Sequence, residues 1–134
     1  MTDKIIDKLG LIALSQSKIA MVRSHNKQLF YIPGGKRELG ETDEQALCRE
    51  INEELTLKLD TSSIRFYGEF IGLADGKQDG TQVHIRCYFA EYNGKPQPAA
   101  EIAELAWFDS HDLSRCSTTA VHILQRLKQD GLIK

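Results

Sequence analysis

A glycine pair followed by an acidic helix pattern, at residues 34–55, constrains this 134-residue chain more than any other feature. Pro33 restricts the preceding residue to extended backbone, and the pair Gly34–Gly35 can adopt angles closed to other residues, so we expect a strand to enter a turn here. Thr42 is placed to cap a following helix, with Gln45 completing a capping box. Apolar side chains then recur every four residues and predict a face that packs on a core, at Leu47, Ile51 and Leu55.

Three glutamates stand close together near the end of this helix. Glu50, Glu53 and Glu54 are spaced three and four residues apart, where like charges repel by about 0.2–0.5 kcal/mol per pair. A divalent cation would offset the repulsion, because clustered carboxylate oxygens suit Mg²⁺ or Mn²⁺. A solvated acidic helix face is the simpler alternative for an isolated triplet.

Composition bounds the class of protein. The length fits one domain, 1–134, and 41% hydrophobic residues can bury a core. A net charge of −2 gives no basic footprint for a nucleic acid polymer. The three scattered cysteines argue against disulfides and a zinc site, and the N-terminus does not resemble a signal peptide. We therefore expect a cytoplasmic protein that has no membrane segment.

The rest of the chain alternates strand and helix patterns, which predicts an α+β fold with a mixed β-sheet packed between helices. A hairpin is expected around residues 15–18, and a turn with two Asp-Gly pairs at 74–80 should join two strands. The expected strands span 63–73, 81–92 and 104–110, and the expected closing helix runs from the cap Ser117 to Gly131. In the second strand, Val83, Ile85, Cys87 and Phe89 share one face, and His84, Arg86 and Tyr88 share the other.

The acidic helix belongs to a longer pattern, G-x5-E-x7-R-E-U-x-E-E-x-G-U, where U is a bulky aliphatic residue. Ile51 and Leu57 occupy the two U positions, and the fixed positions are filled by Gly35, Glu41, Arg49, Glu50, Glu53 and Glu54. This resembles the Nudix box, and the chain resembles a Nudix hydrolase of the small MutT-like type. "YIPGG" before the box and "ELAWFDSHDL" after it are similar to the corresponding family segments.

The resemblance implies a Mg²⁺-dependent pyrophosphohydrolase, with Mn²⁺ as a possible substitute. Its substrate would be a nucleoside diphosphate linked to another group, such as a nucleoside triphosphate or a damaged nucleotide. The metal would be held by Gly35, Glu50, Glu53 and Glu54, with Glu101 as the preferred additional ligand. Arg49 and the three glutamates would form the catalytic set, and Arg49 would pair with Glu41 to fix the loop on the helix.

Other roles are less constrained by the pattern. The general base would be a box glutamate or a later carboxylate, Glu101 or Glu104, both of which are alternatively solvated charges. Cations near the phosphates, and aromatic rings for stacking on a base, have several candidates. The cations are Arg23, Lys36, Arg37, Arg86 and His84, the rings are Tyr31 and Tyr88, and Trp107 is assigned to the core.

One box position departs from the family. Thr56 replaces the glycine that follows the helix, and a β-branched residue is poor at positive φ. We therefore expect the helix to run on or to turn without a left-handed residue.

Other functions remain open at this stage. Within the enzyme class, the alternatives are an ADP-ribose, nucleotide-sugar or dinucleotide pyrophosphatase. Outside it, they are a non-catalytic Nudix sensor that binds a nucleotide and a plain interaction module. The partner is expected to be a small nucleotide, and the protein a monomer or homodimer. The intact glutamate pattern favours the enzyme, since sensors usually lose box carboxylates.

Overall fold

The computed structural model of the chain describes residues 4–75 and 79–134. Its helices are α1 (Asp43–Leu55) and α2 (Thr118–Gln129), with short 3₁₀ turns η1 (Thr61–Ser63) and η2 (Ser110–Arg115). Its strands are β1 (Ile5–Ile12), β2 (Leu14–Ser15), β3 (Lys18–Ser24), β4 (Gly34–Lys36), β5 (Lys58–Leu59), β6 (Arg65–Leu73), β7 (Gln82–Phe89), β8 (Tyr92–Asn93) and β9 (Ile102–Phe108).

The main sheet has four strands in the order β4-β1-β7-β6, and it is mixed. β1 and β7 run parallel, while β4 and β6 are antiparallel to their neighbours. A second sheet, β2-β3-β9, is antiparallel, and β5 pairs with β8. Because β4 pairs with β1 at the edge of the main sheet, the glycine pair lies beside the middle of β1.

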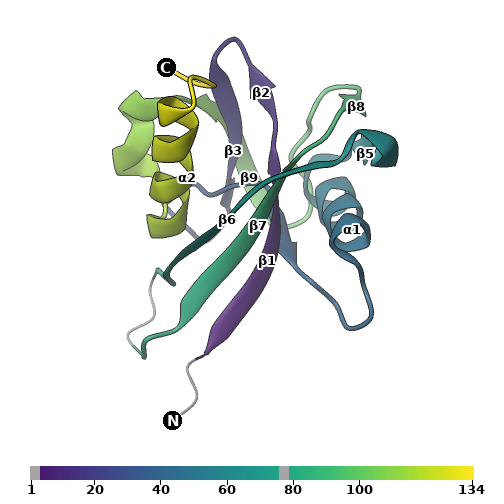
Figure 1. Cartoon of the computed structure of the whole chain (residues 1–134), viewed down its shortest axis with the longest axis horizontal. Coiled ribbons are helices and arrows are strands. Elements are labelled where there is room, and N and C mark those ends of the chain that lie inside the picture. Colours follow the sequence, from purple (N-terminus) through teal and green to yellow (C-terminus); the bar gives the residue numbers. More distant parts are fainter. Residues whose placement is uncertain (1–3, 76–78) are drawn as a thin grey trace.

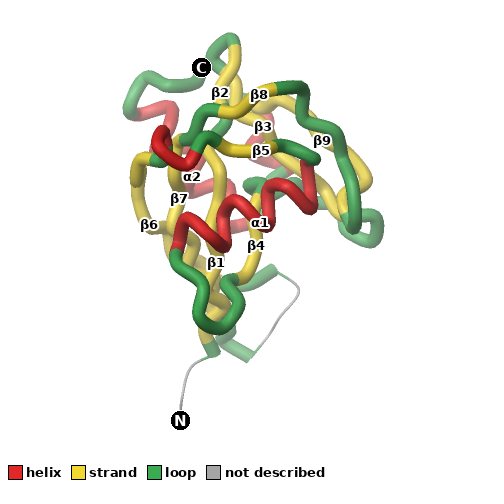
Figure 2. The backbone as a smooth tube through the Cα atoms, turned by 90° about the vertical axis from the view of Figure 1, so that its right-hand side faces the viewer, coloured by secondary structure: helices red, strands yellow, loops and turns green. Residues whose placement is uncertain are grey.

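The two helices cover opposite faces of the main sheet, as the predicted α+β fold requires (Figure 1). α1 lies across β1 and β4 (Figure 2) and packs on one apolar cluster that includes Leu9 and Leu11. α2 packs on the other cluster, which includes Ile85 and Cys87 of β7. Successive residues of each strand therefore point alternately to α1 and to α2.

α1 begins and is anchored as its sequence predicts. The Thr42 hydroxyl accepts the Gln45 N–H at 3.1 Å, and the Gln45 side chain accepts the Thr42 N–H at 2.9 Å, which completes the capping box. Leu47, Ile51 and Leu55 are all fully buried. These three side chains fix the rotation of the helix, and so the direction in which its glutamates point.

The end of α1 contradicts the expectation made for Thr56. The helix stops at Leu55, and Thr56 adopts the left-handed conformation, with φ 57° and ψ 36°. The Thr56 N–H donates to the Asn52 carbonyl at 3.0 Å, so the threonine closes the helix in the way that a glycine would. Leu57, which is 1% exposed, enters the core directly afterwards and fixes this turn despite its conformational cost.

Other predicted elements are present with shifted bounds. The hairpin forms between β2 and β3, and Ser117 caps α2. The expected strand 81–92 is divided into β7 and β8, because the chain turns away to pair with β5. In the expected turn 74–80, residues 76–78 lie outside the described residues, and Gly80 has a positive φ of 80°. Within the described part of the chain, no helix is long and apolar enough to span a membrane.

Candidate active site

Two α1 carboxylates meet the backbone of the glycine pair. Glu54 is only 2% exposed, and its carboxylate accepts the Gly34 N–H at 2.9 Å. At Gly35, an added Cβ would lie 2.4 Å from the carboxyl carbon of Glu50, so any side chain there would displace that carboxylate. The glycines therefore let β4 approach the helix closely enough for both glutamates to reach its backbone.

Burial of these carboxylates disfavours their charged forms. Burial, with repulsion from Glu101 and Glu50, raises the pKa of Glu54 to about 8, although the Gly34 N–H opposes the rise. Burial also raises the pKa of Glu50, against the attraction of Arg49. The site thus gathers carboxyl groups whose ionised forms are not fully supported by neighbouring cations.

Arg49 provides part of the compensation. Its guanidinium forms the predicted ion pair with Glu41, and the pair is bidentate, with N–O distances of 2.8 and 2.9 Å. It also contacts Glu50 at 2.9 Å and Glu53 at 3.6 Å, and it donates to the Lys36 carbonyl at 3.0 Å. One arginine therefore ties the loop before α1 to the helix and offsets repulsion between two of the box glutamates.

The predicted metal ligands are near one another, but their side chains do not form a complete coordination sphere. Glu50 and Glu54 point inward, and Glu101 is close enough to Glu54 to raise its pKa. The Glu53 side chain is 53% exposed and points toward Arg49. Across residues 4–75 and 79–134, no three acidic, histidine or cysteine side chains form a ready set of metal ligands.

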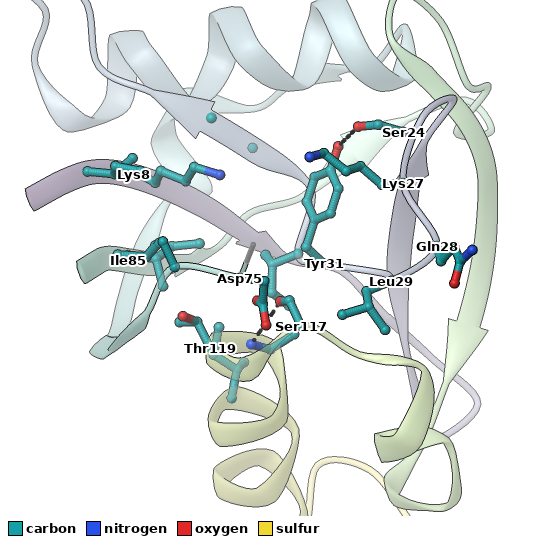
Figure 3. A pocket seen from close by; sticks show the side chains of 18 residues that line it. Lys8, Ser24, Lys27, Gln28, Leu29, Tyr31, Asp75, Ile85, Ser117 and Thr119 are labelled. Atoms are coloured by element: carbon teal, nitrogen blue, oxygen red, sulfur yellow. Dashed lines mark hydrogen bonds between the residues drawn. The ribbon is translucent and has the colours of Figure 1, made fainter. Parts of the chain in front are cut away.

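A pocket of about 550 Å³ opens beside the glycine pair. It lies on the α2 side of the main sheet and is lined by Val83 and Ile85 of β7 and by Ser117 and Thr119 at the start of α2. Figure 3 shows Ile85, Ser117 and Thr119 on this wall. Tyr31, a candidate for stacking on a base, lines the pocket, and its hydroxyl hydrogen-bonds to Ser24. Gly34 and Gly35 lie between the pocket and the carboxylates of Glu50 and Glu54. Because glycine has no side chain, no side chain at these two positions separates the pocket from the carboxylates.

The face of β7 that carries the candidate cations His84 and Arg86 does not line the pocket. Val83 and Ile85 of β7 line it, whereas His84, Arg86 and Tyr88 point to the opposite side of the sheet. Arg86 and Tyr88 there bind Asp43 in the first turn of α1, with Arg86 donating at 2.7 Å. The N-terminus of α1 covers this face, so the face does not border the pocket.

Other candidate cations are also paired. Arg37 contacts Asp7 at 3.1 Å and Asp43 at 2.6 Å. Arg23 contacts Glu104 at 3.2 Å. This ion pair also engages Glu104, which was the other candidate general base outside the box. These pairs hold loops in position. Among the described residues, two of the five candidate cations form no ion pair: Lys36, which is exposed, and His84, which hydrogen-bonds to Gln82 at 3.0 Å.

Asp43 joins three side chains from different parts of the chain, a role that was not predicted from the sequence. It lies in the first turn of α1, where an acid is favourable without any partner, yet it accepts hydrogen bonds from Arg86 and Tyr88 and pairs with Arg37. These donors hold the pKa of Asp43 near 2, against the effect of burial. No local sequence signal joins residues that are more than 40 positions apart.

Comparisons with known proteins agree with this architecture. Residues 7–127 match the family model described as the NUDIX domain. No curated protein matches the chain in sequence.

Solved structures share the fold at low identity. The E. coli ORF135 protein is 22% identical with a TM-score of 0.74, over 96% of this chain and 94% of its own. A MutT NUDIX hydrolase from Burkholderia pseudomallei is 20% identical with a TM-score of 0.71, over 95% and 98%. A UDP-X diphosphatase is 20% identical with a TM-score of 0.70, over 98% of this chain and 66% of its own.

Proposed function

Since the chain belongs to the Nudix family of hydrolases, we propose that it is a divalent-metal-dependent pyrophosphohydrolase of nucleoside diphosphates linked to another group. The substrate we favour is a nucleoside triphosphate, ordinary or damaged, cleaved to the monophosphate and pyrophosphate. One observation carries the proposal. The buried carboxylates of Glu50 and Glu54 meet the backbone of the glycine pair directly beside a pocket of nucleotide-binding size.

The donor set fits a divalent cation. Burial and mutual repulsion raise the pKa of both Glu50 and Glu54, so a nearby positive charge would favour their ionised forms. Hard carboxylate oxygens suit Mg²⁺ or Mn²⁺. We assign the ligands to Glu50, Glu53, Glu54, the Gly35 carbonyl and Glu101. Glu53 would turn from its exposed position to join them.

The chain's own residues have distinct tasks in this proposal. When bound, the ion would offset the charge of the diphosphate and lower the pKa of a water molecule. Arg49 keeps Glu50 and Glu53 together and holds the loop before α1 against the helix. A box glutamate or Glu101 would accept the proton of the attacking water.

The pocket supports a nucleotide over a smaller phosphate ester. Its floor is apolar at Val83 and Ile85, and the Tyr31 ring offers a surface on which a base can stack. The reacting diphosphate would lie at the glycine end, next to the carboxylates. A sensor without catalysis would not need four carboxylates around this end.

A panel of substrates tests the proposal. Purified protein is assayed with nucleoside triphosphates, oxidised nucleotides, nucleotide sugars, ADP-ribose and dinucleoside polyphosphates, in Mg²⁺, in Mn²⁺ and in excess EDTA. We expect turnover of at least one triphosphate, abolished by EDTA and reduced about 10²-fold or more by Glu53→Gln or Glu54→Gln. Turnover undiminished in EDTA would remove the metal mechanism. Binding of a nucleotide without turnover of any compound would favour a sensor.

A further inference from the structure

A lysine interrupts the apolar row that forms one wall of the pocket. Strand β1 pairs in parallel with β7, so Ile6 lies beside Val83 and Lys8 beside Ile85. Paired residues point to the same face, and this is the face that α2 covers and the pocket opens on. A charged side chain in such a row is costly unless it has a partner, because burial disfavours its charged form.

Lys8 has no such partner among the described residues. No hydrogen bond or ion pair joins its ammonium group to another side chain or carbonyl there, whereas Lys4, directly before the same strand, pairs with Asp79 at 3.3 Å. Burial lowers the pKa of Lys8, and the negative charges of Glu54 and Glu50 act against this. The ammonium group therefore lies near the carboxylate cluster without being neutralised by direct contact.

The Lys8 side chain points into the pocket. Lys8 is half-buried, and its ammonium group lies 5.7 Å from the centre of the Tyr31 ring, pointing into the pocket (Figure 3). Lys27, from the loop after β3, approaches from the opposite side. An anion in this gap would lie between the two ammonium groups, next to the glycine pair.

We propose that Lys8 binds the phosphate attached to the nucleoside, at the boundary between the carboxylate cluster and the base pocket. The inference rests on the proposed function and adds a specificity-determining residue to it. A phosphate there would supply the missing partner of Lys8, and the apolar wall beyond Lys8 would leave the base and sugar to be bound without charge. Lys27, which is exposed, contributes less, because water screens it.

The test separates phosphate recognition from base recognition. Calorimetry in Mg²⁺ measures binding of the four ribonucleoside 5′-monophosphates, which contain no anhydride to cleave, and of the four parent nucleosides. The proteins are the wild type, Lys8→Met and Lys18→Met, which removes the same charge from an exposed hairpin residue outside the pocket. Urea unfolding of each protein reports stability.

We expect Lys8→Met to weaken the tightest-binding monophosphate at least about tenfold, as loss of a hydrogen bond to a charged group requires. Its affinity for the matching nucleoside should be unchanged, and Lys18→Met should match the wild type in both. Equal losses for nucleoside and monophosphate would assign Lys8 to the base or sugar and overturn the proposal.

Unchanged monophosphate affinity in a folded Lys8→Met protein would also overturn the proposal, as would a wild type that binds none of the four monophosphates. Hydrolysis in the substrate panel combined with either result would overturn this inference alone. Failure of every compound in the panel, with monophosphate binding still dependent on Lys8, would overturn the proposed function alone.

Discussion

Replacing Glu54 by glutamine should change how the stability of the metal-free protein depends on pH. Glutamine keeps an oxygen that can accept the Gly34 N–H, now 2.9 Å from the carboxylate, and it is neutral at every pH. In the wild type, the pKa of Glu54 is raised from 4.5 to about 8, chiefly by burial. Between these values the folded protein holds a proton that the unfolded chain has released.

The sign and size of the effect follow from this difference. A raised carboxyl pKa favours folding at low pH, and the benefit is lost as pH rises from 4.5 to about 8. Each tenfold change in proton affinity is worth about 1.4 kcal/mol, so the full loss is on the order of 5 kcal/mol. Glu54→Gln should match the wild type near pH 4.5 and exceed its free energy of unfolding by several kcal/mol near pH 8.5.

Urea unfolding in EDTA, followed by circular dichroism between pH 4.5 and 8.5, measures the slope. Asp43 and Glu41, whose pKa values are lowered to about 2, are present in both proteins, so their effect on stability cancels from the difference between the two profiles. Excess Mg²⁺ should restore stability to the wild type at pH 8.5 more than to Glu54→Gln, because ligands that bind only the folded state stabilise it. Parallel pH profiles for the two proteins in EDTA would refute the reasoning.

Three further substitutions have defined outcomes. Thr56→Gly should raise stability by about 0.5–1 kcal/mol in thermal melts by relieving a left-handed threonine, with Mg²⁺ affinity unchanged; a tenfold change in that affinity would make the turn part of the site. Gly35→Ala should displace the Glu50 carboxylate and weaken Mg²⁺ binding, measured by titration, at least about tenfold. The control Gly68→Ala, whose added Cβ meets only Phe70 at 3.4 Å, should bind Mg²⁺ as the wild type does. Equal Mg²⁺ affinities of the two variants would show that Glu50 is not a ligand. Arg49→Lys should lower the midpoint of urea unfolding, because lysine cannot form the bidentate pair with Glu41, and a wild-type midpoint would contradict that role.

Local patterns predicted the parts of the site that are close in sequence. The capping box, the apolar stripe of α1 and the Glu41–Arg49 pair depend on residues within eight positions of one another, and all are present. The end of α1 was predicted wrongly because Leu57 is drawn into the core. Its burial outweighs the preference of Thr56 against the left-handed conformation.

Contacts between distant elements were not predictable from one sequence. Alternation along β7 divided its residues correctly into two faces, but only the packing of α1 decides which face is open to the pocket. Arg37 and Arg86 look like phosphate ligands until Asp43 is placed between them. Lys8 had a usable signal, since it is charged within the alternating row of Ile6 and Ile12, but the extent of β1 was not recognised.

Counting bound Mn²⁺ by electron paramagnetic resonance tests the central claim most directly, namely that the carboxylates beside the glycine pair hold the ion on which hydrolysis depends. The proteins are the wild type, Glu50→Gln, Glu54→Gln and the control Glu69→Gln, whose carboxylate contacts Arg86 at 3.2 Å and is not one of the assigned ligands. We expect at least one Mn²⁺ bound by the wild type and the control, with affinity at least about tenfold weaker in both site variants. Wild-type affinity in both site variants would contradict the account.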